Sequence, residues 1–272
     1  MQYYAYAKIN LRLEIIKKFA NGYHDLRMLN AKISLKDILD IDLSNENQVT
    51  YSVESLNHLE NNLCLNVLNE LTDIYNIKER YHIHITKNIP QGAGLGGGSS
   101  DVAAIINFID EKYNLKLTLD DKIKVGLKYG ADVPYCLIND LAYVSGIGEN
   151  ITILKERLNI EKLVIVNPNI HISTKEAFSQ VQKYSSETSI DQIRIYIKEG
   201  RLNSLLYNEL EKATFQMSEE LKNLKKSLTQ YGNVIMSGSG STMLVFLNEN
   251  YNILDIKKKY PMYLVEEVDV IS

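Results

Sequence analysis

The sequence lacks the features of several protein classes. Its 272 residues include only two cysteines, Cys64 and Cys136, far apart and without a CxxC pattern, which excludes a disulfide scaffold and is typical of reduced core thiols. No apolar run approaches the ~18–20 residues that a membrane-spanning helix needs. Residues 1–10 lack the basic and apolar regions of a secretory signal. We therefore expect a cytoplasmic location and no membrane partner.

The sequence also lacks a strong charge of either sign. Its 30 lysines and arginines and its 34 aspartates and glutamates give a net charge of −4, which argues against binding nucleic acid through bulk charge. A local basic site for a phosphorylated ligand stays compatible with this balance. The sequence shows no repeat with a period of 20–50 residues, as a solenoid or a propeller would. The 45% of hydrophobic and 24% of charged residues are typical of a globular protein.

Hydrophobic periodicity predicts a mixture of strands and helices. Residues 4–15 alternate with a period of two, and Asn21-Gly22 then favours a hairpin turn before a second strand at 33–43. Further strands are predicted at 81–86, 162–167, 233–237, 242–247 and 262–270. Helices are predicted at 61–75, from Ser99 onward, at 118–129, from about 174, at 203–213 and at 217–230. Because strands and helices do not alternate regularly, we predict an α+β fold, with a boundary near 150–160.

A cluster of glycines is the most distinctive motif. Between the strand at 81–86 and the following helix lie Gly92, Gly94, Gly96, Gly97 and Gly98. Glycines let the backbone approach a ligand and adopt positive φ, and successive N–H groups at a helix N-terminus bind phosphate. Ser99 and Ser100 would add hydroxyl donors or reach a magnesium ion. The alternative is a plain flexible turn.

This loop does not fit the common nucleotide-binding patterns. No lysine follows the glycines, as a Walker A loop requires. Residues 99–130 have the pattern of two helices and not of the second strand of a dinucleotide-binding unit, so we interpret the match to G-x-G-x-x-G as accidental. The protein-kinase motifs H-R-D and D-F-G are absent as well.

The segment Gly130-Ala-Asp-Val-Pro134 places an acidic residue where a helix ends. Pro134 is expected to push Val133 into an extended conformation and so to hold Asp132 on a fixed turn. A carboxylate held there can accept a proton from a substrate hydroxyl. The alternative is an aspartate that only satisfies the N–H groups of the turn.

Lys8 lies within the first predicted strand, where a buried lysine is costly unless it meets an anion. Strand alternation puts Lys8 and Asn10 on one face, so both are candidates to line a site. The alternative is a solvated lysine on an edge strand. The small-residue loop at 236–242 (MSGSGST) either closes on phosphates or forms a simple hairpin. His82 and His84 share a strand face without a third ligand at useful spacing, so no metal site formed by the protein is expected.

Three of these motifs, in this order, resemble the small-molecule kinases that include galactokinase, homoserine kinase and mevalonate kinase. The motifs are the strand with Lys8, the P-x-G-x-G-L-G-x-x-S-S loop at 90–100, and the G-S-G loop near the carboxyl end. Four segments resemble one branch of these kinases: YAKINL at 6–11, NGYH at 21–24, GLGGGSS at 94–100 and GADVP at 130–134. This branch phosphorylates the C2 hydroxyl of a methylerythritol linked to cytidine diphosphate, in the non-mevalonate isoprenoid pathway. The resemblance runs from residue 3 to about 247.

The resemblance implies an α+β fold of two domains. Residues 1–155 would form a ribosomal-S5-like ATP-binding domain, and residues 156–272 a ferredoxin-like substrate domain. It implies ATP, with Mg²⁺ bound to the nucleotide, a small-molecule substrate that carries cytidine diphosphate, and a monomer or weak homodimer.

The resemblance also implies residue roles. Asp132 would take the proton from the hydroxyl, and Lys8 would stabilise both Asp132 and the moving phosphoryl group. The substrate would be bound by Asn10, Tyr23, His24, Thr174 and Phe178, with cytosine between the rings of Tyr23 and Phe178. ATP would be bound by Asn62, Leu63 and Lys87 near adenine, and by Gly92, Gly94, Leu95, Gly96, Gly97, Gly98, Ser99 and Ser100 along its phosphates.

Two positions depart from the family pattern. Asp101 stands where an asparagine or a small residue is more usual, and we expect its carboxylate to point away from the phosphates. Gly240-Ser-Thr242 stands where cysteine or proline is frequent. Two alternatives remain: another kinase of this superfamily, acting on mevalonate or homoserine, and a binding protein that keeps the nucleotide loop without activity. The presence of Lys8 and Asp132 argues against the second.

Overall fold

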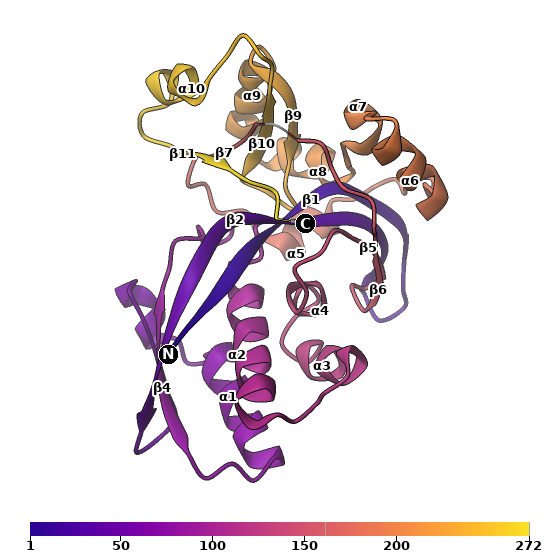
Figure 1. The fold of residues 1–272 in the computed structure, drawn as a ribbon. Helices are drawn as coiled ribbons and strands as arrows, with labels where there is room; N and C mark the ends of the chain where they lie inside the picture. Colours follow the sequence, from indigo (N-terminus) through magenta and orange to yellow (C-terminus); the bar gives the residue numbers. More distant parts are fainter. Residues whose placement is uncertain (161, 272) are drawn as a thin grey trace. The chain divides into compact units, whose positions relative to one another are not determined.

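The computed structural model describes residues 1–160 and 162–271, which form two compact units. Unit 1 comprises Met1–Ala7, Leu35–Ile89 and Gly96–Ile138, and unit 2 comprises Lys8–Ser34, Pro90–Leu95 and Asn139–Ser272. In chain order the elements (Figure 1) are β1 (Gln2–Lys18), β2 (His24–Ser44), β3 (Gln48–Tyr51), the 3₁₀ helix η1 (Glu54–His58), α1 (Leu63–Ile74), β4 (Arg80–Thr86), α2 (Gly97–Tyr113), α3 (Leu119–Gly126), α4 (Val133–Cys136), β5 (Ala142–Gly146), β6 (Asn150–Ile153), β7 (Leu163–Asn167), α5 (Thr174–Ser179), α6 (Ile190–Lys198), α7 (Leu202–Leu205), β8 (Tyr207–Asn208), α8 (Leu210–Met217), α9 (Glu219–Leu228), β9 (Gly232–Met236), β10 (Met243–Leu247), α10 (Ile253–Lys259) and β11 (Leu264–Val268).

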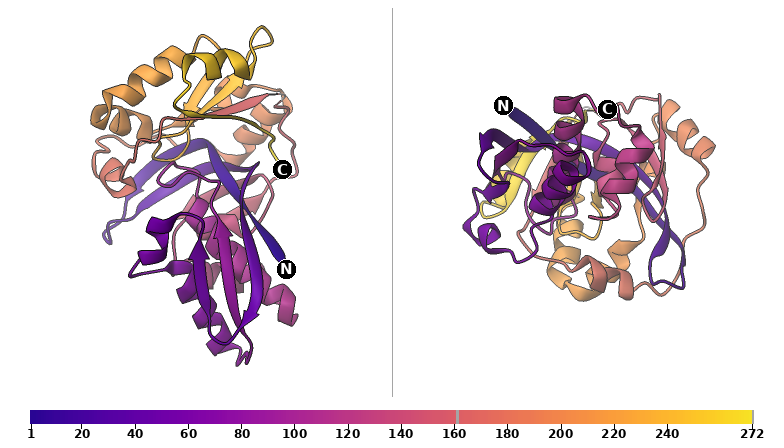
Figure 2. Two further views of the ribbon diagram at one scale, coloured as in Figure 1. Left: turned by 90° about the vertical axis from the view of Figure 1, so that its left-hand side faces the viewer. Right: turned by 90° about the horizontal axis from the view of Figure 1, so that it is seen from below.

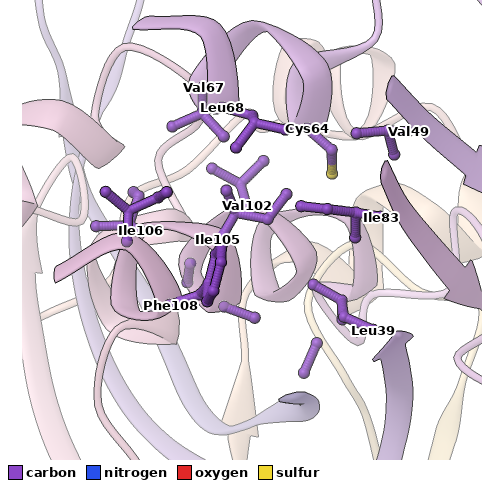
Figure 3. Packing of buried hydrophobic residues seen from close by; sticks show 14 of the residues in the cluster. Leu39, Val49, Cys64, Val67, Leu68, Ile83, Val102, Ile105, Ile106 and Phe108 are labelled. Atoms are coloured by element: carbon purple, nitrogen blue, oxygen red, sulfur yellow. The ribbon is translucent and has the colours of Figure 1, made fainter. Parts of the chain in front are cut away.

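Unit 1 is a sheet covered by helices. β3 lies parallel to β4, and β4 lies antiparallel to the second half of β2, with Leu39 opposite Ile85. α1 and α2 lie side by side and share one apolar core with these strands (Figures 1 and 3). Leu68 of α1 and Phe108 of α2 are fully buried in it. Burying each such side chain stabilises the fold by about 1.5–3 kcal/mol.

The predicted hairpin near Asn21-Gly22 is confirmed in unit 2. Gly22 has φ +89°, a left-handed conformation that glycine adopts at little cost, and Phe19 N donates to Tyr23 O at 2.8 Å. Within this unit β1 pairs in parallel with β8, while β2 pairs with β5, which in turn pairs with β6.

A second sheet of unit 2 has the strand order β11-β7-β10-β9, and all its pairs are antiparallel (Figure 2). Helices separate β7 from β9, and α10 separates β10 from β11, so the element order is βαββαβ. α9 packs on β9 and α10 on β11. This arrangement confirms the predicted ferredoxin-like topology.

The structure corrects several predicted elements. Residues 203–213 do not form one helix, because β8 interrupts them between α7 and α8. α6 was not predicted. The expectation for Val133 is wrong, since Val133 is the first residue of α4 and Pro134 the second. Proline is tolerated at this point because the first helical N–H groups have no partner within the helix.

Two further features concern the hydrophobicity of the helices and the predicted domain boundary. No helix in residues 1–160 or 162–271 is both long and apolar enough to span a bilayer. The compact units are discontinuous, because the long strands β1 and β2 contribute residues to both. They therefore differ from continuous domains divided at residue 155, a division that stays a prediction.

Candidate active site

The glycine loop adopts the backbone that its sequence predicts. Gly92, Gly94 and Gly96 have φ +59°, +75° and +68°. A Cβ on Gly94 would lie 2.0 Å from the carbonyl oxygen of Ser237, so only glycine fits there. At Gly94 the backbone of the glycine loop therefore lies directly against the backbone of Ser237 and not against a ligand. This contact packs the glycine loop on residues 237–242.

The helix that follows the loop begins without a side-chain cap. α2 starts at Gly97, two residues before the predicted start at Ser99, and its N-cap is Gly96. By contrast, α1 is capped by Asn62 and α3 by Thr118. The first-turn N–H groups of a helix attract anions. Because the N-cap of α2 is a glycine, no N-cap side chain occupies these N–H groups.

The loop at 237–242 is fixed by buried polar side chains. Asn208 Nδ2 donates to Met236 O at 2.7 Å and to Gly238 O at 2.8 Å, and Asn167 Nδ2 donates to Thr242 Oγ1 at 2.9 Å. Ser237 Oγ donates to Gly94 O at 2.9 Å. The segment is the loop of the hairpin between β9 and β10, as one of the two alternatives expected, and through Ser237 it also supports the glycine loop.

Lys8 and Asn10 share one face of β1, as predicted. Lys8 is 3% exposed, and its Nζ donates to Asn10 Oδ1 at 2.8 Å. Asn10 Nδ2 in turn donates to Asn30 Oδ1 at 2.7 Å. A buried cation needs such partners because its desolvation is costly, so the alternative of a solvated lysine on an edge strand is excluded.

Asp132 is the N-cap residue of α4, yet its carboxylate does not cap the helix. Its carbonyl oxygen accepts from Cys136 N at 3.1 Å. The alternative interpretation is that the carboxylate only satisfies N–H groups of the turn. For the N–H groups at the start of α4, the structure does not support it.

A buried ion cluster lies behind the start of α2. Lys87 Nζ donates to Asp37 Oδ2 and, at 2.5 Å, to Asp101 Oδ2. Asp37 Oδ1 also accepts from the backbone N–H groups of Asn88 and Ile89. Oδ1 of Asp101 has no hydrogen-bond partner among the described residues.

One cation faces two carboxyl groups in this cluster. Burial would lower the pKa of Lys87, but the charges of Asp101 and Asp37 outweigh that effect and raise it. Burial raises the pKa of Asp101 to about 8, against the opposing effect of Lys87. The carboxylate of Asp37 accepts three hydrogen bonds, whereas Oδ1 of Asp101 has no partner among the described residues, so Asp101 is the better holder of a proton.

The residues predicted to bind the substrate base lie together in unit 2. The rings of His24 and Phe178 are stacked, with centroids 5.0 Å apart. Tyr23 is 55% exposed. Thr174 Oγ1 lies 2.8 Å from Ser239 Oγ, so α5 contacts the loop at 237–242.

Two segments of the chain match known kinase domains. Residues 62–140 match the GHMP kinases N terminal domain and residues 182–260 match the GHMP kinases C terminal domain. The chain is 35% identical over 258 residues to the 4-diphosphocytidyl-2-C-methyl-D-erythritol kinase of Clostridium perfringens (strain 13 / Type A). The matched region covers 92% of this chain and 89% of that protein. The chain belongs to this kinase family.

Solved structures agree with this membership. A crystal structure of 4-(cytidine 5'-diphospho)-2C-methyl-D-erythritol kinase superposes with a TM-score of 0.80 at 25% identity, covering 98% of this chain and 99% of that one. Homoserine kinase from Cytophaga hutchinsonii superposes with a TM-score of 0.73 at 17% identity, over 99% and 94% of the two chains, and shows the fold alone. The predictions of an ATP-dependent small-molecule kinase and of its two-domain α+β fold are confirmed.

In this kinase family member, the predicted site residues fall in both units. Unit 2 holds Lys8, Asn10, Tyr23, His24, Gly92, Gly94, Leu95, Thr174 and Phe178. Unit 1 holds Asn62, Leu63, Lys87, Gly96, Gly97, Gly98, Ser99, Ser100 and Asp132. Their individual roles toward ATP and substrate, including the pairing of Lys8 with Asp132, stay predictions.

Several residues that support the site were missed by sequence reasoning. Asn208, Asn167 and Asp37 hold loops through buried hydrogen bonds. For Asp37 a signal existed, because it shares the strand face of Leu35 and Leu39, which the alternation places in the core. For Asn208 no local signal existed, because its partners lie 28 and 30 residues further along the chain.

Proposed function

We propose that this protein transfers the γ-phosphoryl group of ATP to the C2 hydroxyl of 4-diphosphocytidyl-2-C-methyl-D-erythritol. The observation that carries the proposal is the likeness, over 92% of the chain, to kinases that bear this substrate's name. The chain also keeps Lys8 and Asp132, the two residues that the chemistry requires.

In the proposed reaction, Asp132 accepts the proton of the hydroxyl as its oxygen attacks the γ-phosphorus. The bond between the γ-phosphorus and the bridging oxygen breaks, and ADP leaves with that oxygen. Lys8 stabilises the negative charge that spreads over the phosphoryl oxygens, while the N–H groups at the start of α2 hold the other phosphates. Such transfers depend mainly on positioning and charge stabilisation.

The residues of this protein fit a magnesium ion that binds together with the nucleotide. Among residues 1–160 and 162–271 no group of three or more His, Cys, Asp or Glu side chains is placed to hold a metal. Mg²⁺ commonly keeps several waters and binds through phosphates with few protein ligands. Ser99 would be the hydroxyl that holds it, because Ser100 Oγ is buried and donates to Tyr6 O at 2.8 Å. When bound, Mg²⁺ would neutralise phosphate charge.

The substrate's base would contact the rings of unit 2. One face of Phe178 is covered by His24, so cytosine would stack on the other face. The family likeness implies that the exposed ring of Tyr23 covers the far side of the base. Burial and the nearby charge of Lys18 lower the pKa of His24. A neutral imidazole has one donor and one acceptor, which suits the mixed edge of cytosine.

The test is turnover of ATP with magnesium against three alcohols: 4-diphosphocytidyl-2-C-methyl-D-erythritol, mevalonate and homoserine. We expect activity on the cytidine compound alone. In Asp132→Asn, kcat should fall about 10²–10⁴-fold with the substrate's Kd nearly unchanged. Activity on mevalonate or homoserine, or a near-normal kcat in the variant, would contradict the proposal. Inactivity of the wild type on all three would favour a silent binding protein.

The remaining expectations belong to this proposal. A monomer or weak homodimer in the cytoplasm, acting on a small molecule without nucleic acid, follows from the family likeness and the mild net charge. Sedimentation of the purified protein would test the oligomeric state.

A further inference from the structure

Residues 180–189, which we call the strap, connect α5 to α6. The strap begins two residues after Phe178, whose ring stacks on His24. None of residues 181–189 is buried, so apolar packing does not hold the strap. Segments with few buried apolar contacts open easily. Polar contacts must therefore keep the strap in place.

The first polar anchor is Glu14 of β1, whose side chain is 2% exposed. Thr188 donates to it twice, from N to Oε2 at 2.9 Å and from Oγ1 to Oε1 at 2.6 Å. Arg12, on the same face of β1, donates to Glu14 Oε1 at 2.8 Å and to Thr188 Oγ1 at 2.8 Å. These bonds form a closed, charge-assisted set, and charge-assisted bonds are stronger than neutral ones.

The second polar anchor is Glu209, the residue after β8, which is 7% exposed. Its Oε2 accepts from Ser185 Oγ at 2.7 Å and from Tyr207 Oη. The backbone N–H of Ser185 also donates to Ile15 O at 2.7 Å. The strap is thus fastened at residues 185 and 188 to two buried carboxylates.

The position of Phe178 depends on this fastening. α5 has six residues, and of these only Ala177 is buried. A helix this short is not stable by itself. The strap holds the carboxyl end of α5, and the contact of Thr174 with Ser239 holds its amino end. Release of the strap would leave Phe178 on a helix held only by its amino end and by its packing on α8.

We propose that Glu14 and Glu209 are positioning residues for the pyrimidine-bearing substrate, because they fasten the strap and so fix Phe178 against His24. The proposal rests on the proposed function, which assigns Phe178 to the pyrimidine. When the strap opens for part of the time, the apparent affinity falls in proportion to the competent fraction. ATP, which does not use Phe178, keeps its affinity.

The test changes the strap and leaves the buried carboxylates in place, so that the fold is preserved. Ser185→Ala removes the donor to Glu209, and Ser186→Ala is its matched control. Ser186 is the exposed neighbour of Ser185. Thr188→Val removes the hydroxyl that meets Glu14, whereas Thr188→Ser keeps it.

Two readouts are measured on the full chain. We expect Ser185→Ala and Thr188→Val to raise KM for the cytidine substrate about tenfold, as loss of a hydrogen bond to a charged group predicts, with kcat and KM for ATP within twofold. Tryptic cleavage after Lys183, measured without any substrate, should accelerate about tenfold in the same two variants. Ser186→Ala and Thr188→Ser should match the wild type in both readouts.

The outcomes separate this proposal from the proposed function. Faster cleavage with an unchanged KM for the cytidine substrate would overturn the positioning role. Unchanged cleavage would overturn the anchoring itself. If the wild type does not phosphorylate the cytidine compound, the proposed function fails, and the positioning role toward a pyrimidine fails with it. The cleavage rates would then still decide whether Glu14 and Glu209 fasten the strap.

Discussion

The ring of His24 lies against the ring of Phe178, with 25° between their planes and 5.0 Å between their centroids. His24 follows the hairpin turn of β1 and β2, whereas Phe178 lies in α5, more than 150 residues further along the chain. The stack therefore joins two segments at the place where the family likeness expects the substrate's base. Stacked aromatic pairs contribute about 0.5–1.5 kcal/mol beyond the area that they bury.

Replacing Phe178 tests its part in substrate binding. Phe178→Ala removes the ring on which cytosine would stack, so KM for the cytidine substrate should rise about tenfold, in line with the energy of an aromatic pair. KM for ATP serves as the internal control and should not change. Steady-state kinetics with each substrate varied in turn measures both. An equal rise of the two KM values would contradict a role limited to the cytidine substrate.

Asp101 should make stability depend on pH. Its pKa is raised to about 8 in the folded chain, whereas an unfolded carboxyl titrates near 4. The folded state then binds more protons between about pH 4 and 8, so the free energy of unfolding falls as pH rises through this range. Asp101→Asn removes this titration. As the pH is raised from 5.5 to 8, the free energy of unfolding of the wild type should fall by more than about 1 kcal/mol relative to that of the variant. Urea unfolding of both proteins at each pH measures this difference. Parallel curves for the two proteins would show that Asp101 does not titrate there.

Gly94 and Gly98 give a matched pair within one cluster of glycines. Gly94→Ala places a Cβ 2.0 Å from Ser237 O at a φ of +75°, whereas a Cβ on Gly98 meets no heavy atom within 4 Å. We expect Gly94→Ala to lower the free energy of unfolding by about 2 kcal/mol or more. Gly98→Ala lies in α2 and should keep or slightly raise it, because alanine favours helix. Thermal unfolding followed by circular dichroism compares the two. Equal Tm values would mean that the loop can move away from Ser237.

Asn208 should be needed for stability as well as for the loop at 237–242. Asn208→Ala leaves Met236 O and Gly238 O without their buried donor, and an unsatisfied buried polar group costs about 1–3 kcal/mol. We expect a loss of about 3 kcal/mol in the free energy of unfolding, measured in urea. Asn233→Ala, at an exposed position of β9, is the control and should change it by less than about 0.5 kcal/mol. A similar effect of both substitutions would argue against the anchoring role.

The sequence predicted those parts of the fold that depend on local patterns. The hairpin at Gly22, the strand β4 and the helix α1 all follow from periodicity and turn residues. The glycine loop could be predicted as well, because positive φ and close approach leave few alternatives to glycine.

The remaining parts depend on contacts between distant residues. Residues 203–213 have a helical pattern, yet Tyr207–Asn208 pair with Arg12–Leu13 of β1, and this tertiary pairing interrupts the helix. In α6, Ile193, Ile195 and Ile197 fit a period of two as well as a helical period, and β-branched residues favour strands. The cap by Ser189 was the signal that would have identified this helix.

The discontinuity of the compact units has a consequence for synthesis on the ribosome. Unit 1 ends at Ile138, so all of its segments exist at that point, whereas residues 8–34 belong with segments beyond Asn139. At about 5–20 residues per second, residues 139–272 take ~7–27 s to appear. During that time most of unit 2 is still missing. The side chains of Ile9, Leu11 and Ile15, which are fully buried in the folded protein, therefore lack most of their packing partners. The nascent chain therefore presents an apolar strand to chaperones and to other nascent chains, and slower translation after residue 138 lengthens that exposure.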